Sequence, residues 1–193
     1  MTLVLVTGSE GRVTAVTAAL SEAGCRCVSA IDVASMKAVL AGLVDERVDA
    51  YVQLPVEISA TADTAIGRIR ELLTEGLVAR FDAAEVAVTA VGDGGAIFLV
   101  AGNTPGEREL TDDQRARYAL LRVLSHTILA DCAGRDVRSV VLPSNTTPAD
   151  VASVVLGQSS AREQAIADFV DLESDLSYSD WRVELLSLAT NES

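Results

Sequence analysis

The sequence predicts a single α/β domain in which helices cover both faces of a doubly wound parallel sheet. Short apolar runs alternate along the chain with longer stretches of helical periodicity, an order typical of parallel strands joined by crossover helices. Glycines, prolines and capping residues separate these segments. The chain has 193 residues, of which 49% are hydrophobic, so it is large enough to bury one core.

In the first half of the chain, apolar runs alternate with helical patterns. The segments are a strand over 3–6, a helix over 12–23, a strand over 27–31, a helix over 33–44 and a strand over 49–54. Gly8 follows the first strand, Gly24 ends the first helix, and Asp32 ends the second strand. Strands separated in this way by single helices pair in parallel.

The second half continues the alternation with longer helices. The segments are a helix over 61–91, a strand over 96–101, a helix over 111–133, a strand over 137–142 and a helix over 148–156. We expect the first of these helices to break near Gly76 or Asp82. Thr111 and Gln114 have the spacing of a capping box, and Pro148 suits the first turn of the last helix.

The C-terminal segment has a different character from the rest of the chain. It carries eight acidic residues against two arginines. We therefore assign the domain to 1–160 and an acidic extension, packed on the same domain, to 161–193. Residues 162–172 fit a helix, and 181–186 fit either a helix or a closing strand. Such acidity usually marks a solvated surface, and the alternative is a docking tail anchored by Trp181.

Charge and cysteine content exclude several classes of function. Fifteen basic against 28 acidic residues give a net charge of -13, which repels a phosphate backbone and argues against nucleic-acid binding. We expect no membrane span and no signal peptide, because the apolar runs are short. The three cysteines form no CxxC pair, so we expect reduced thiols, a cytoplasmic location and no metal site. Lys37 is the only lysine.

Three stretches carry a resemblance to a known family. They are 4–32, which reads as strand, glycine turn, helix and second strand, then 94–102, and finally 129–156. In order and spacing they resemble the short-chain dehydrogenase/reductase family over about residues 2–157. The resemblance implies a Rossmann-like fold, an NAD(P) cofactor and a tyrosine–lysine pair that moves the substrate proton.

The resemblance also assigns cofactor-binding residues. The family's turn reads TGxxxGxG or TGxxGxxG. Thr7, Gly8 and Gly11 match the second form, whereas Thr14 replaces its third glycine. Asp32 lies near the place from which the family holds the adenosine ribose, and its alternative role is a solvated strand end. The binding residues that the resemblance implies are therefore Thr7, Gly8, Gly11 and Asp32.

Two further departures weaken the predicted cofactor pocket. Glu10 suits the positive end of a helix dipole, but it also brings negative charge to the place of the pyrophosphate. Residues 53–55 read Gln-Leu-Pro, where the family has a motif of small residues beside the cofactor. We therefore expect either no cofactor or weak NAD(P) binding.

The family's catalytic residues have no equivalents here. Ala101 and Gly102 occupy the place of its serine. One register of the following helix puts Gln114 and Tyr118 at the tyrosine and lysine positions, and another puts Tyr118 and Arg122 there. The single lysine lies elsewhere, and the planar guanidinium of arginine does not replace a compact ammonium. We expect no catalytic residue, with Tyr118 and Arg122 as the alternative.

The chain is also shorter than the family pattern in two places. Sixteen residues separate Asp32 from Asp49, which is enough for one crossover helix but not for the family's extra edge strand. Four residues separate Pro143 from Pro148, where the family carries a substrate-covering segment. The predicted domain therefore lacks an edge strand and a substrate lid.

Two helical stretches, 68–91 and 111–133, carry more apolar residues than one buried face requires. The second stretch includes Leu120 and Leu124. In the resembled family these helices form the dimer contact, so we expect a homo-oligomer or a hetero-oligomer with an active relative. The alternative is that the domain buries both faces internally.

These departures predict a non-catalytic protein that acts as a scaffold, a regulatory subunit or a partner of an active relative. Two alternatives belong to other functional classes. One is an NAD(P)-dependent oxidoreductase with a displaced proton donor, Tyr118. The other is an NAD(P)-binding sensor that uses Gly8, Gly11 and Asp32 without chemistry.

Overall fold

The computed structural model describes residues 1–43, 46–56, 61–101, 112–142 and 146–157, with the side chains of 69, 72, 75 and 112–119 left aside. The acidic extension therefore lies outside the described residues. So do its expected helix over 162–172, the ambiguous segment 181–186 and Trp181.

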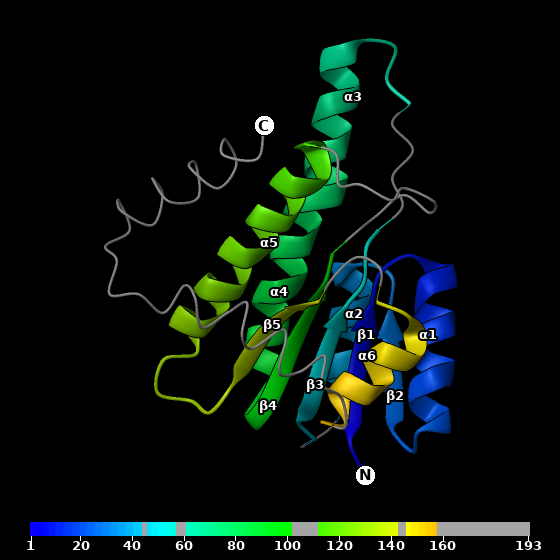
Figure 1. Ribbon diagram of the computed structural model, residues 1–193, viewed down its shortest axis with the longest axis vertical. Helices are drawn as coiled ribbons and strands as arrows, with labels where there is room; N and C mark the ends of the chain where they lie inside the picture. The colour runs from blue at the N-terminus through cyan, green and yellow to red at the C-terminus, as the bar shows by residue number, and fades with distance from the viewer. Residues whose placement is uncertain (44–45, 57–60, 102–111, 143–145, 158–193) are drawn as a thin grey trace.

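The described part of the chain forms one sheet of parallel strands (Figure 1). The strands are β1 (Leu3–Thr7), β2 (Arg26–Ala30), β3 (Val48–Gln53), β4 (Val91–Val100) and β5 (Arg138–Leu142). Their order is β2-β1-β3-β4-β5, and every described pair is parallel. The predicted parallel sheet is thus confirmed, with β2 at the edge where the resembled family has a further strand.

Helices cover both faces of the sheet, which confirms the doubly wound, Rossmann-like architecture. One face carries α1 (Glu10–Glu22) and α6 (Pro148–Val155), which pack against each other. The other carries α2 (Val33–Ala41), α4 (Ala79–Ala90) and α5 (Asp112–Asp131), with α4 in contact with both neighbours. No described helix is long and apolar enough to cross a membrane.

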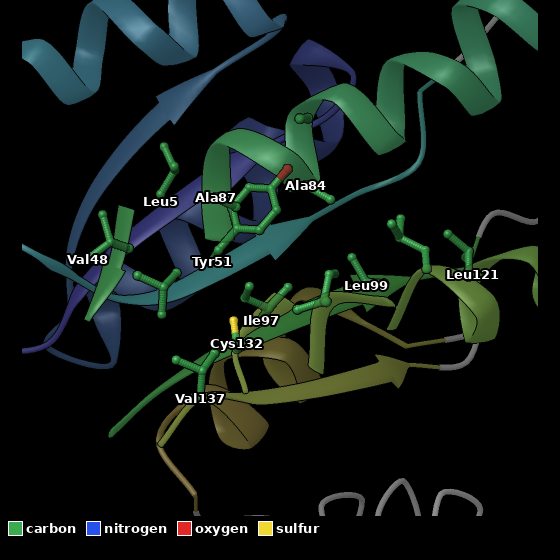
Figure 2. Packing of buried hydrophobic residues seen from close by; sticks show 14 of the residues in the cluster. Leu5, Val48, Tyr51, Ala84, Ala87, Ile97, Leu99, Leu121, Cys132 and Val137 are labelled. Atoms are coloured by element: carbon green, nitrogen blue, oxygen red, sulfur yellow. The ribbon is translucent and has the colours of Figure 1, made fainter. Parts of the chain in front are cut away.

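The alternation of side chains along each strand divides the core into two layers. Val4 and Val6 of β1 pack toward α1 and α6, whereas Leu5 packs toward the opposite face. Figure 2 shows this second layer, in which the Tyr51 ring lies among strand side chains and the α4 residues Ala84 and Ala87. Alanines on α4 let the helix approach the sheet closely enough to enclose an aromatic ring.

The long helical stretch before β4 changes its hydrogen-bonding pattern instead of ending. It consists of α3 (Ala65–Glu71), the π-helix η1 (Leu72–Val78) and α4. The expected break near Gly76 falls within η1, whereas Asp82 lies inside α4, where the helix is continuous. Figure 1 shows α3 extending well beyond the end of the sheet, so this segment is only partly covered by the domain.

The start of β4 corrects the sequence prediction. The sequence predicts a strand that begins at 96, but β4 already begins at Val91. Gly94 has a φ of 80°, and a Cβ on Gly95 would lie 2.5 Å from Val91 Cγ1. The register of the pairing with β3 shifts in the same region. The glycines therefore allow the strand to pass through an irregularity instead of ending there.

Candidate functional site

The carboxyl ends of β1 and β3 form the topological switch point of the sheet. From β1 the chain passes through α1 to β2 on one side, and from β2 it passes through α2 to β3 on the other side. Ligands of open α/β sheets bind in the crevice at such a point. The residues at this point are Thr7 and Gly8, at and just after the end of β1, and Gln53 and Leu54, at and just after the end of β3.

The glycine turn at this point is closed against the segment that follows β3. Gly8 has a φ of 145°, and a Cβ placed on it would lie 2.6 Å from Leu54 Cβ. The Leu54 amide donates a hydrogen bond of 2.7 Å to the Thr7 carbonyl, and the Ser9 amide donates one of 3.3 Å to the Pro55 carbonyl. The close packing of the turn against Leu54 therefore accounts for a glycine at position 8, without any bound ligand.

The start of α1 keeps one open position. A Cβ on Gly11 would meet no atom within 4 Å, so packing within the described residues does not require this glycine. Thr14, which replaces the family's third glycine, is exposed, and its hydroxyl donates a 2.9 Å hydrogen bond to the Glu10 carbonyl. Both Glu10 and Thr14 therefore lie on the solvent side of the helix, and Glu10 is in its first turn as predicted.

Asp32 has a structural role that the sequence did not reveal. It is the N-cap of α2, and its Oδ1 accepts hydrogen bonds from the Ser35 amide at 2.7 Å and the Ser35 hydroxyl at 2.6 Å. These bonds lower the pKa of the Asp32 carboxyl. The capping box by itself accounts for an aspartate at this position. That Asp32 also binds the adenosine ribose of a cofactor stays a prediction.

A buried polar network joins the ends of β1 and β3 to α4. The Thr7 and Tyr51 hydroxyls lie 2.7 Å apart, and the Gln53 amide nitrogen donates to the Tyr51 hydroxyl at 3.1 Å. The same nitrogen donates to the Arg80 carbonyl at 2.8 Å, and Arg80 Nε donates to Gln53 Oε1 at 2.8 Å. Burial raises the pKa of the Tyr51 phenol, so this hydroxyl stays protonated.

Arg80 extends the network to β4. Its Nη2 donates a hydrogen bond of 2.8 Å to the Val100 carbonyl and a longer one, 3.5 Å, to the Gln53 carbonyl. Its side chain is 8% exposed, and burial lowers the pKa of the guanidinium to about 10. The group is therefore still a cation at neutral pH, and its charge lies among neutral acceptors.

Sequence reasoning missed Arg80, although the sequence holds a signal for it. Arg80 precedes Ala83, Ala84 and Ala87 at helical spacing, and all four side chains face the interior. An arginine in phase with a stripe of small buried residues lies on the core side of its helix. This spacing points to a buried guanidinium, which needs acceptors at the strand ends nearby.

The residues predicted for catalysis form no described site. Ala101, in the place of the family's serine, is buried and offers no hydroxyl. Tyr118 lies on α5, but its side chain is outside the described part. Arg122 is half-buried on the same helix, and the pKa of His126 is lowered first by burial and then by the charge of Arg122.

The described residues offer no cluster of three histidine, cysteine or acidic side chains that could hold a metal ion. Cys25, Cys27 and Cys132 are all free thiols, and burial raises the pKa of each of them. None of the three has the lowered pKa of a reactive thiolate.

Solved structures that this chain is similar to include short-chain dehydrogenases/reductases. An enzyme of that family from Serratia marcescens matches with a TM-score of 0.61 at 16% identity, over 81% of this chain and 88% of the other. BdcA of E. coli matches with a TM-score of 0.51 at 20% identity, over the same share of each chain. BdcA has also been solved in complex with NADPH. No family model and no curated protein matches the sequence.

Proposed function

We propose that this chain, which has the short-chain dehydrogenase/reductase fold in a shortened form, is a non-catalytic protein that acts as a scaffold or regulatory subunit. The observation that carries the proposal is the network at the strand ends. Thr7, Tyr51, Gln53 and Arg80 direct their polar atoms toward one another and toward backbone carbonyls. Side chains engaged in this way hold the sheet together and are not free to transfer a proton to a substrate.

A turnover assay tests this proposal. We expect no oxidation of NADH or NADPH with a panel of carbonyl compounds, because Ala101 offers no hydroxyl and the chain's one lysine, Lys37, lies on α2 and not on α5. The competing oxidoreductase uses Tyr118 as its proton donor. Turnover that Tyr118→Phe lowers by about 100-fold or more would therefore overturn the proposal, whereas activity unchanged by this substitution would identify a contaminant.

The closed turn also supports a cofactor pocket that is lost or weak. Gly8, whose free space a pyrophosphate would need, is packed against Leu54. We expect millimolar NAD, NADH, NADP or NADPH to shift the melting temperature by less than about 1 °C. Binding at 100 times the Kd would stabilise by about 2.7 kcal/mol and raise it by about 5–10 °C.

One observation favours the NAD(P)-binding sensor as a second candidate. Gly11 opens onto free space at the start of α1, and the Asp32 side chain is exposed after the end of β2. A clear rise in melting temperature with NAD or NADH alone would support the sensor if Asp32→Ala abolishes it. Asp32→Asn is the gentler variant, because asparagine also caps helices.

Exposed apolar side chains support assembly through the two helical stretches named above. Three of the large hydrophobic residues that the described structure exposes lie on them: Leu73, Val78 and Leu120. A fourth, Ile66, lies on α3 two residues before the first stretch. Leu124 is only 4% exposed and belongs to the core, which corrects its place in the surplus apolar surface. We propose that a second copy of the chain covers the exposed group, since isolated domains seldom expose a continuous apolar surface.

The oligomer is expected to dissociate when charge enters this surface. The test variant is Ile66→Asp, because the Ile66 side chain is 83% exposed on this surface. The matched control is Ile31→Asp, because Ile31 follows β2, away from this surface, and is 62% exposed. We expect light scattering to give the mass of a dimer for the wild type and for Ile31→Asp, and of a monomer for Ile66→Asp. A wild-type monomer, or a dimer in all three proteins, would contradict this interface.

The three free thiols are consistent with a reducing compartment, and we propose a cytoplasmic location on this basis.

A further inference from the structure

Arg80 carries a positive charge that has no negative partner in the described structure. Its hydrogen bonds go to the side-chain oxygen of Gln53 and to the backbone carbonyls of Gln53 and Val100, which are all neutral. These bonds use Nε and Nη2. A guanidinium has five N–H donors, so the two on Nη1 have no acceptor among the described residues.

The charge is not needed for the structural role of this side chain. A neutral donor would satisfy the same three oxygens without the cost of removing a cation from water. That cost is visible in the lowered pKa of Arg80, whose first cause is burial. A cation kept at such a position therefore calls for an anion that the described chain does not supply.

The position of Arg80 is one where ligands bind in this class of fold. Gln53 and Val100 are the last residues of β3 and β4, so the guanidinium lies across the carboxyl ends of these adjacent strands. The next residue after β4 is Ala101, whose side chain is a single methyl group. Open α/β sheets bind their ligands beyond these strand ends.

We propose that Arg80 is the anion-recognition residue of a small-molecule site at the carboxyl ends of β3 and β4, with Nη1 as the donor to a carboxylate or phosphate oxygen. Neither subunit assembly nor the absence of catalysis requires such a site, so it is a function beyond those proposed above. It gives a regulatory subunit a ligand to sense.

The geometry also defines how the ligand is held. Arginine usually binds carboxylate or phosphate through two nitrogens at once. Here the edge formed by Nε and Nη2 is already occupied by Gln53 and Val100. The ligand therefore meets a single terminal nitrogen with two N–H groups. Because the whole chain has a net charge of -13, diffuse attraction of anions is weak, and a saturable response reports a local site.

The test is thermal unfolding of the full chain at pH 7, titrated with inorganic phosphate or with acetate in place of chloride at constant ionic strength. We expect at least one of these anions to give a saturable rise of about 3–6 °C at ten times its Kd. A response to phosphate alone identifies a phosphate ligand, and a response to acetate alone identifies a carboxylate ligand. The absence of a saturable rise with either anion would overturn the proposal.

Two variants separate this site from a general salt effect. Arg80→Met is expected to lose the response. Arg135→Gln is the matched control, because Arg135 also donates to backbone carbonyls, those of Val88 and Val91 at the other end of α4, and it is expected to keep the response. An equal rise in all three proteins would assign the effect to salt and overturn the proposal.

A measurement on the wild-type protein remains decisive if Arg80→Met does not fold. Buried guanidinium N–H protons exchange slowly and give separate NMR signals. We expect the Arg80 signals to move with the same Kd as the melting temperature, whereas those of Arg135 stay in place. Arg80 signals that do not move at a saturating concentration of either anion would overturn the assignment.

Discussion

Replacing Gly8 with alanine is expected to lower the free energy of unfolding by about 3 kcal/mol. Two costs combine in this substitution. A φ of 145° is unfavourable for any residue with a side chain, and the new methyl group would lie 2.6 Å from Leu54 Cβ. The Leu54 carbonyl oxygen, at 3.1 Å, blocks the escape of the methyl group to one side. Urea unfolding of the purified variant measures the loss.

Gly11 supplies a control within the same turn. A Cβ at this position meets nothing within 4 Å, and Gly11 already lies in helix α1. Gly11→Ala is therefore expected to be neutral or to stabilise by up to about 1 kcal/mol, because alanine favours the helix and restricts the unfolded chain. Equal losses in Gly8→Ala and Gly11→Ala would contradict the contact-based explanation.

A second substitution shows whether Leu54 causes the loss. Leu54→Gly removes the Cβ that Gly8→Ala would strike, although it leaves the backbone atoms of Leu54 in place. The double variant is expected to be more stable than the sum of the two single losses predicts, by about 1–2 kcal/mol. Strictly additive losses would show that backbone conformation alone accounts for the requirement for glycine.

The order of strands and helices was predictable because it depends on local patterns. Apolar runs and helical spacing set the five strands, and Pro148 marks a helix start that the structure confirms. The start of β4 was not predictable in the same way. Glycine signals a turn in isolation, but β4 pairs with β3 at Val91 and again from Ala96, where its pairing with β5 also begins, so the strand continues across the irregular residues 92–95.

The candidate site was only partly predictable, because its main contacts join segments that are distant in sequence. Thr7, Gly8, Gly11 and Asp32 were found from the glycine turn and the end of the second strand, yet Gly8 packs on Leu54 and Asp32 caps α2. A local pattern does not show which segment a turn will meet. The same limit hid the network around Arg80, since an arginine on a helix is normally solvated.

The apolar surface illustrates a third limit. Helical spacing showed that α5 has more apolar residues than one face requires, but it did not show which of them the sheet covers. In the structure Leu121, Leu124 and Ile128 are buried, whereas Leu120 remains partly exposed. The surplus is therefore real but smaller than the sequence count, and most of the exposed apolar side chains of this region lie on α3 and η1.

The buried network also contributes to stability in a way that can be measured. Gln53 accepts a hydrogen bond from Arg80 Nε and donates to both the Tyr51 hydroxyl and the Arg80 carbonyl. One neutral side chain thus orients a phenol and compensates a cation. The charge of Arg80 makes these interactions unequal, because losing an acceptor for a buried cation costs more than losing a neutral bond.

A neutral hydrogen bond elsewhere in the core provides the comparison. The hydroxyls of Ser125 on α5 and Ser139 on β5 are buried and lie 2.8 Å apart. Ser139→Ala leaves one hydroxyl without its partner and is expected to cost about 1 kcal/mol. This value is the reference for the loss of an uncharged contact at similar burial.

Gln53→Leu is expected to lower the free energy of unfolding by about 3 kcal/mol, clearly more than Ser139→Ala, because Arg80 Nε is left buried without an acceptor. Adding Arg80→Met removes the stranded cation and fills the space with an apolar chain of similar length. The double variant is therefore expected to recover at least about 1 kcal/mol relative to Gln53→Leu. Urea unfolding at pH 7 with unchanged m values measures both effects. Two results would contradict this explanation. One is a Gln53→Leu variant that loses no more unfolding free energy than Ser139→Ala. The other is a double variant that is less stable than Gln53→Leu, because Gln53 would then not compensate the charge of Arg80.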